Sequence, residues 1–363
     1  MRSVGVWACL TYLALVAGVA HGAQTIEHWR NVDDAWFATD EGRRVVDNVL
    51  SWQNANSGWW KNYDTLTPRP PAARPGASPL AGKNDGATAW ESGSTFDNGA
   101  TFNEIRLLAK AHRLTGRADC ADAVRRGLEF VLSAQYPHGG FPQRFPLQDN
   151  YGRHVTFNDN AMVGVLRVLR DAAHGSPDFA FLDQAMRDRC RAAFDLGIDC
   201  ILRCQIRVGA TLTAWCQQHD AETLAPIGAR TFEPPALCST ESAEIALLLM
   251  ELESPEPRVR AAIESAIAWF ESTKILGYRY QRFTGPEYET GAARKLIEDP
   301  AAPPLWPRLR DIKTGKPLFV DRDGSTHDDV KALSVERQAG YAWYSTAPNK
   351  AISAYAEWKQ KHL

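Results

Sequence analysis

Four segments of this chain end in the same way, and this repetition most constrains how the chain can fold. They are VVDNVLSWQNANSGWWKNYD (45–64), LEFVLSAQYPHGGFPQRFP (128–146), IDCILRCQIRVGATLTAWCQQHD (198–220) and, more loosely, IAWFESTKILGYRY (267–280). In each, an apolar helical pattern ends, the chain turns through glycine, and an aromatic residue follows. Repeats of this size predict an architecture of similar, stacked units. The first two segments align without gaps, matching Ser51, Gln53, Gly58, Trp59 and Tyr63 with Ser133, Gln135, Gly140, Phe141 and Phe145.

Three further helices are predicted between these segments. The first opens with Thr101-x-x-Glu104, a capping box, and stops at Gly116. The second starts near Asn160 and also ends at a glycine. The third, STESAEIALLLMELE, is apolar almost all round, which predicts burial on every side. The order is therefore helix pair, glycine-rich connection, helix pair, repeated about three times.

Consecutive antiparallel helices of this kind can close into an α/α toroid, with one helix of each pair inside and one outside. We therefore predict a single all-α domain over residues 23–363 with little β structure; an open superhelix is the alternative. Strand-like alternation is scarce outside 275–283. The stretches 65–94 and 284–345 are expected to be long loops, and loops of that length are usually functional. We expect them to wall a cleft at one end of the toroid.

The first 22 residues have the layout of a secretory signal peptide. Arg2 precedes an apolar stretch that runs to about Ala20, and Ala20-His21-Gly22 is a suitable cleavage site. A membrane anchor is the alternative, but the apolar stretch is short for a span. We expect a secreted or periplasmic protein, monomeric and free of the membrane once the signal is removed.

Composition narrows the class of partner. The formal net charge of -2 gives no overall attraction for nucleic acid or anionic lipid, so a site for a polyanion must be a local cluster of Arg and Lys. No CxxC motif is present, which argues against a zinc site. Disulfide pairing among the six cysteines beyond the signal is left open; these are Cys120, Cys190, Cys200, Cys204, Cys216 and Cys238.

Acidic and amide side chains precede the predicted inner helices. TFDNGATFNE carries Asp97 and Asn98, and TFNDNAM carries Asp159 and Asn160. Helix capping is the simplest interpretation of such residues. Thr101, however, already supplies a cap for the first helix, which leaves Asp97 and Asn98 without a helical role. In a toroid these entrances, with Thr240 and Glu241 of the third helix, would converge. Asp97, Asn98 and Asp159 would then offer the hard oxygen ligands that Ca²⁺ takes.

Basic residues near the same turns suggest what such a cation would help to bind. Lys61 lies in GWWKNYD, Arg144 in GGFPQRFP and Arg230 in GARTFEPP. Arginine forks bind carboxylates and aromatic residues stack on sugars, so the set suits an acidic polysaccharide. Taken singly, each could be a solvated surface charge. Three more arginines lie in the C-terminal irregular region: Arg308, Arg322 and Arg337.

Several stretches together resemble the family 10 polysaccharide lyases, the pectic acid lyases. They are TFDNGAT…TFNDNA, LTAWCQQHD…LAPIGAR, PPLWPRLRDIKTGKPLFVDRDG and ERQAGYAWY, and the resemblance runs from about residue 40 to 345. It implies an (α/α)₃ toroid that cleaves polygalacturonate by Ca²⁺-assisted β-elimination.

The resemblance also implies roles for individual residues. Asp97 and Asp159 match the calcium-site aspartates, with Asn98 beside them as a further ligand or substrate contact. Arg230 matches the arginine proposed to remove the C5 proton. For substrate binding the resemblance implies Arg308 and Lys61, and the residue pattern adds Arg144, Asn98 and Arg322. Because arginine is protonated far above neutral pH, an arginine base needs nearby positive charge to lower its pKa and should work best in alkali.

Some positions depart from the family pattern. Trp60 replaces a usual proline, the stretch at Arg308 reads PRLRD, and PPALCST follows the Arg230 segment. Endo or exo action and methyl-ester tolerance are therefore left open. A glycoside hydrolase using Asp97 and Asp159 as a carboxylate pair is an alternative, as is a non-catalytic protein that binds acidic polysaccharide. In WCQQHD, His219 and Asp220 could line the cleft, or His219 could be structural.

Overall fold

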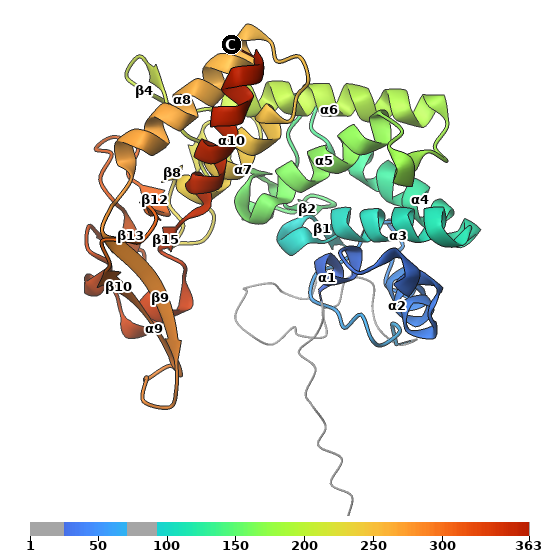
Figure 1. The fold of residues 1–363 in the computed structure, drawn as a ribbon, viewed down its shortest axis with the longest axis horizontal. Helices are drawn as coiled ribbons and strands as arrows, with labels where there is room; N and C mark the ends of the chain where they lie inside the picture. The colour runs from blue at the N-terminus through green and yellow to red at the C-terminus, as the bar shows by residue number, and fades with distance from the viewer. Residues whose placement is uncertain (1–24, 71–92, 363) are drawn as a thin grey trace, which may run out of the picture.

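The computed structural model describes residues 25–70 and 93–362, and the predicted signal peptide lies outside these residues. Figure 1 shows helices packed as successive pairs. One row consists of α3 (Phe102–Thr115), α5 (Ala161–Ala173) and α7 (Ser239–Met250). The other consists of α4 (Ala118–Ala134), α6 (Gln184–Cys204) and α8 (Pro257–Thr273), preceded by α2 (Asp40–Ser51). Helices α3 to α8 each pack on a pair partner and on a neighbour in the same row, and α2 packs on α3.

The arrangement confirms the all-α toroid of repeated helix pairs, although the ring stays open and does not close into a barrel. Helices α3 and α5, with the short α1 (Ile26–Arg30), line a groove and so form the inner row. As its composition predicts, α7 is buried on nearly every side. The C-terminal α10 (Ala347–His362), which the sequence analysis did not identify, covers α7 and α8.

A glutamine after each of the first three outer-row helices ties one unit to the next. The side-chain amide of each donates two hydrogen bonds, one to a carbonyl of its own turn and one to a carbonyl within the following outer helix. Gln53 bonds Ser57 and Ala123, Gln135 bonds Gly139 and Ala193, and Gln205 bonds Thr213 and Ala262, all at 2.7–3.0 Å. Lys274 occupies the equivalent position after α8.

The aromatic residue of each repeat also has a shared role. The buried indoles of Trp59, Trp215 and Trp306 each donate to a carbonyl near the end of the preceding outer helix, at 2.8–2.9 Å. The acceptors are the carbonyls of Val49, Ile201 and Phe270. Phe141 fills the equivalent position of the second unit and is fully buried. Each glycine-aromatic turn is therefore fixed against the helix that precedes it.

We expect Gln205→Ala to lower the free energy of unfolding by about 1–3 kcal/mol, because two carbonyls would lose the donor that Gln205 provides in a buried site. Urea denaturation measures the effect. Lys274→Ala is the matched control: Lys274 has the same place in the last unit, but its amine bonds only the exposed Glu271. Equal losses in the two variants would contradict the linking role of the glutamine.

Short antiparallel strands connect the turns and lead into the inner helices. β1 (Ser94–Thr95) pairs with β2 (Arg144–Phe145), and β8 (Leu237–Cys238) pairs with β12 (Leu309–Arg310). Between them, β6 (Gln218–His219) lies between β3 (Val155–Thr156) and β7 (Pro226–Ile227). Helices α3, α5 and α7 each follow one of these strands, so their entrances gather at one end of the ring.

The region 284–345 is more ordered than the expected long loop. β9 (Tyr278–Thr284) and β10 (Ala292–Glu298) form a hairpin that projects from the body (Figure 1). The same region holds β11 (Trp306–Pro307), paired with β15 (Tyr344–Ser345), then β13 (Phe319–Val320), β14 (Thr326–His327) and the short α9 (Val335–Gly340). A second small core around Phe319 and Trp343 supports them. The stretch 65–94 lies largely outside the described residues.

The structure also bears on the capping box and on the cysteines. The capping-box prediction is wrong for the side chain of Thr101: its hydroxyl makes no cap and instead bonds the backbone of Trp59 and Thr95. This links the α3 entrance to the first Gly-Trp turn. The six cysteines that the structure describes are all buried free thiols.

Candidate active site

The two similar helix entrances adopt the same backbone shape. Asp97–Gly99 and Asn158–Asn160 each form one 3-10 turn after a strand, and Asn98 and Asp159 share a left-handed φ of 51°. Counted from the strands, Asp97 is therefore equivalent to Asn158, and Asn98 is equivalent to Asp159. Residues with short polar side chains tolerate this conformation best, which accounts for Asn and Asp at these positions.

The structure brings Asp97 and Asp159 together. Asp97 is buried, its Oδ2 accepts a hydrogen bond from Lys61 Nζ, and its Oδ1 has no hydrogen-bond partner. Asp159 is open to solvent on one side, but the protein around it displaces much of its water. This desolvation and the negative charge of Asp97 raise the pKa of Asp159 to about 7, against the opposing effect of Arg308. The two carboxylates repel one another across a space that a cation would suit.

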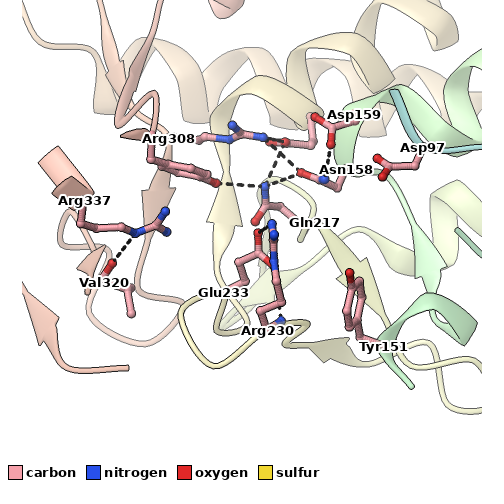
Figure 2. Close-up of polar contacts among 12 residues, drawn as sticks. Asp97, Tyr151, Asn158, Asp159, Gln217, Arg230, Glu233, Arg308, Val320 and Arg337 are labelled. Atoms are coloured by element: carbon pink, nitrogen blue, oxygen red, sulfur yellow. Dashed lines mark hydrogen bonds and ion pairs between the residues drawn. The ribbon is translucent and has the colours of Figure 1, made fainter. Parts of the chain in front are cut away.

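Arg308 lies beside this pair in a hydrogen-bonded network. Its Nη2 donates to Glu241 Oε1 at 2.5 Å and to Asn158 Oδ1 at 3.2 Å, and Gln217 Nε2 reaches the same two oxygens at 3.1 and 2.8 Å (Figure 2). Asn158 Nδ2 donates in turn to Asp159 Oδ2 at 2.7 Å. Arg308 is thereby fixed next to Asp159, while its Nε remains without a partner.

Asn158 and Gln217 belong to this network and were missed by the sequence analysis. The signal for Asn158 was the register of TFDN against TFND, which places it where Asp97 stands in the first unit. Gln217 lies in WCQQHD, where attention went to His219 and Asp220. His219 is structural: it is fully buried, its Nδ1 contacts the carbonyl of Leu224 at 2.9 Å, and burial lowers its pKa to about 4.

Arg230 lies in the loop between β7 and β8 and is held by Glu233. Its Nε donates to Glu233 Oε2 at 2.8 Å and its Nη2 to Oε1 at 2.5 Å. The hydrogen bond to Glu233 raises the pKa of Arg230 above its usual range; burial opposes this, and the charges of Glu233, Tyr151 and Tyr341 add to it. In this arrangement Arg230 is a firmly protonated cation.

The remaining predicted cations occupy different settings. Arg144 is 5% exposed and its guanidinium lies between the rings of Trp60 and Tyr151, at 5.6 and 5.5 Å. Arg322 is exposed and forms a two-pronged ion pair with Glu336 at 2.8 and 3.0 Å. Arg337 is buried, donates to the carbonyl of Val320 and lies against Phe232, Tyr341 and Trp343. Arg337 is therefore a structural residue of the second core.

A cavity of about 250 Å³ adjoins Lys61 and Asn98 and is lined on one side by Glu104. The carboxyl of Glu104 is buried and accepts a hydrogen bond from the Tyr63 hydroxyl at 3.2 Å. Burial raises the pKa of Glu104 to about 8, although backbone amides and Tyr63 oppose the shift. Glu104 is thus a neutral acid at pH 7 in the folded protein.

This shift predicts a pH-dependent stability. Between about pH 4.5 and 8 the Glu104 carboxyl ionises in the unfolded chain but stays protonated in the folded protein, so its contribution to stability is lost as the pH rises. Gln cannot ionise, so we expect Glu104→Gln to gain stability relative to the wild type over this window. Urea unfolding at pH 5, 6.5 and 8 measures the difference, with the exposed Glu264→Gln as control. A difference that stays constant with pH would contradict the shift.

The residues at the two entrances fit a hard divalent cation. Asp97 Oδ1 lacks a partner, the pKa of Asp159 is raised by desolvation and by the charge of Asp97, and Asn98 adds an exposed amide beside them. In the part of the chain that the structure describes, three or more His, Cys, Asp or Glu side chains nowhere gather as a metal cage. A cation at Asp97 and Asp159 would therefore complete its shell with water and ligand oxygens. No helix within residues 25–70 and 93–362 could cross a membrane.

Comparisons with known proteins identify the family and the fold. The family model described as pectic acid lyase matches residues 43–352. The structure is similar to a family 10 polysaccharide lyase from Cellvibrio cellulosa, with a TM-score of 0.76 and 29% identity over 92% of this chain and 95% of that one.

A second similar structure is a mutant of a family 10 polysaccharide lyase from Cellvibrio cellulosa in complex with trigalacturonic acid. Its TM-score is 0.75, with 29% identity over 93% of this chain and 99% of that one. No curated protein matches the sequence. The family match over most of the chain, on a helical toroid shared with a solved member, establishes that this chain belongs to the pectic acid lyase family and is a polysaccharide lyase.

Proposed function

We propose that the protein is a pectate lyase that cleaves polygalacturonate by β-elimination, with Ca²⁺ held by Asp97, Asp159 and Asn98 and with Arg230 as the base. The observation that carries the proposal is the placement of two carboxylates that repel one another beside the cations Lys61 and Arg308. Such a mixed site suits a substrate that brings its own carboxylates. A similar solved lyase that binds trigalacturonic acid supports the same substrate class.

The chemistry requires removal of the weakly acidic C5 proton next to a uronate carboxylate. As the proton leaves, negative charge develops on that carboxylate, and fixed positive charge lowers the energy of this state. When bound, a divalent cation would supply that charge stabilisation. Arg308, fixed by Glu241 and Asn158, is placed to add a guanidinium contact, and Lys61 holds Asp97 in position. Arg144, Arg322 and Asn98 are proposed to bind further uronate units.

Arg230 is the proposed base, and its ion pair with Glu233 determines how readily it can lose the proton that this role requires. A guanidinium has no free electron pair, so Arg230 must lose a proton before it can take one from C5. The two bonds to Glu233 oppose that loss. Positive charge brought by the bound cation would favour it. We therefore expect the elimination rate to rise with pH well into the alkaline range.

A spectrophotometric assay tests the proposal. Polygalacturonate and methylated pectin are incubated with the purified protein, and ultraviolet absorbance is followed because elimination leaves a conjugated unsaturated uronate. We expect absorbance to appear on polygalacturonate, to vanish after exhaustive chelation and to return with Ca²⁺. New reducing ends without absorbance would establish hydrolysis instead, and binding without either signal would indicate a non-catalytic polysaccharide-binding protein. Activity that survives chelation would remove calcium from the mechanism.

We further propose that the protein is exported and acts as a monomer. Polygalacturonate is too large to enter a cell intact, which favours an enzyme outside the cytoplasm, in line with the expected signal at residues 1–22. N-terminal sequencing of the mature protein and its elution volume on gel filtration test the two points. A mature chain that still begins at Met1 would contradict export through this signal.

A further inference from the structure

Tyr151 is a half-buried tyrosine that the proposed mechanism has not used, and its place is closely fixed. It begins the short turn Tyr151–Arg153, where the Asn150 side chain accepts from Gly152 N at 2.9 Å and the Asn150 carbonyl accepts from Arg153 N at 3.1 Å. The hydroxyl of Tyr136 bonds the carbonyl of Arg153 and secures the end of the turn. The backbone that carries Tyr151 is therefore held at both ends.

Arg144 contacts both the phenol ring and the hydroxyl of Tyr151. Its guanidinium lies over the ring at 5.5 Å, and its Nη2 donates to the Tyr151 hydroxyl at 3.4 Å. Arg144 is itself paired in the sheet with Thr95, two residues before Asp97. A side chain at Gly152 would crowd Arg144, because an added Cβ would lie 3.2 Å from Arg144 Cδ. Tyr151 is thus tied to the strand that leads into the first entrance.

The side chains of Tyr151 and Arg230 extend from two different segments of the chain toward the same site residues (Figure 2). Figure 2 shows them below Asn158 and Asp97, with the phenol hydroxyl and the guanidinium both directed toward these residues. Tyr151 is near enough for its charge to act on Arg230. In a galacturonide the C5 hydrogen and the 4-oxygen are on opposite faces of the ring. A base and an acid for this reaction must therefore stand on opposite sides of the sugar, as these two groups can.

We propose that Tyr151 is the general acid that protonates the departing 4-oxygen of the polygalacturonate chain. The inference rests on the proposed function, in which Arg230 is the base. The C5–H bond breaks and its proton goes to Arg230; the bonding pair forms the C4–C5 double bond. The C4–O bond breaks with its pair on oxygen, and that oxygen takes the Tyr151 proton. Solvent returns a proton to Tyr151 and removes one from Arg230, so no water is consumed.

The chemistry favours a tyrosine for this task. A sugar alkoxide is more basic than a phenolate, so transfer from a phenol, whose pKa is ordinarily about 10, is downhill. The hydrogen bond from Arg144 and the nearby guanidinium of Arg230 would stabilise the phenolate formed. None of the carboxylates already assigned to the cation site is needed for the step.

The test compares two leaving groups in the holoenzyme with Ca²⁺ present. On polygalacturonate, we expect Tyr151→Phe to lower kcat by about 10²–10⁴-fold with KM little changed, as for loss of a general acid. The second substrate is an oligogalacturonide with fluoride at C4 of its terminal residue, since fluoride leaves without being protonated. Fluoride release should be equally fast in the wild type and in Tyr151→Phe. Equal losses on both substrates, or no loss on polygalacturonate, would overturn the assignment.

Two further variants keep the outcomes distinct. Tyr288→Phe removes a hydroxyl between β9 and β10, in the hairpin that projects from the body, and it should leave kcat near the wild-type value on both substrates. Arg230→Ala should lose activity on both substrates, because both need the C5 proton removed. If Arg230→Ala is active, the proposed base fails whatever Tyr151 does. If Arg230→Ala is inactive and Tyr151→Phe is fully active, the Tyr151 inference alone fails.

Discussion

Replacing Arg230 with alanine is expected to lower kcat on polygalacturonate by about 10²–10⁴-fold, the usual contribution of a positioned base. KM should change little, because the proposed substrate contacts of Lys61, Arg144 and Arg308 are untouched. Arg230→Lys should also be severely impaired: it keeps the positive charge but loses the planar fork that Glu233 orients at 2.5 and 2.8 Å. Initial rates over a range of substrate concentrations and pH separate kcat from KM.

The structure supplies the control for this experiment. Glu233 is 5% exposed, and loss of Arg230 would leave its carboxylate without its partner, so stability must be measured beside activity. Arg207→Ala removes an exposed arginine whose guanidinium bonds only a neighbouring turn carbonyl, and it should behave as the wild type. Full elimination activity in a folded Arg230→Ala protein would show that another group removes the C5 proton.

The second large effect is expected at the two entrances. Asp159→Asn should abolish calcium stimulation and lower kcat/KM by at least about 100-fold, since charge stabilisation by a metal ion is worth several kcal/mol. Asp97→Ala should do the same and should also release Lys61. Isothermal titration with Ca²⁺ alone gives a readout that does not depend on turnover, and both variants should bind the ion much more weakly.

Asp149→Asn is the matched control, because Asp149 is fully exposed and contacts only Arg153. Unchanged Ca²⁺ titration in both Asp97→Ala and Asp159→Asn would place the ion elsewhere. Loss of activity with unchanged Ca²⁺ binding would instead assign the two aspartates to the substrate or to the reaction itself.

The architecture could be predicted because the repeat recurs at the level of single residues. Gln53 and Gln135 aligned in the sequence, and in the structure they make the same two bonds. Apolar periodicity also recurs from unit to unit, and it located the inner helices. The hairpin partner AARKLIE was missed because its residues do not alternate in polarity; in the structure it pairs with β9 along its full length.

The site was predicted in part. Short polar residues at the two entrances pointed to the cluster, since repeated units bring equivalent positions together. The failure at Thr101 has a physical cause: its hydroxyl is used by backbone groups of Trp59 and Thr95, which lie beside it only in the folded ring. The bonds of Arg308 to Asn158 and Glu241 also depend on contacts across 150 and 67 positions, which no local pattern encodes.

The glutamine links bear on how accurately the active site can be built. Asp97 belongs to the first unit, Asp159 belongs to the second, and Arg308 follows the last. The distances between these residues therefore depend on the three glutamine links between successive units. A small deviation in the angle between two successive units adds to the deviation at the next link. Gln53, Gln135 and Gln205 limit the deviation in this angle at each link. Loosening one of these links would therefore misalign the reacting groups before it unfolded the protein.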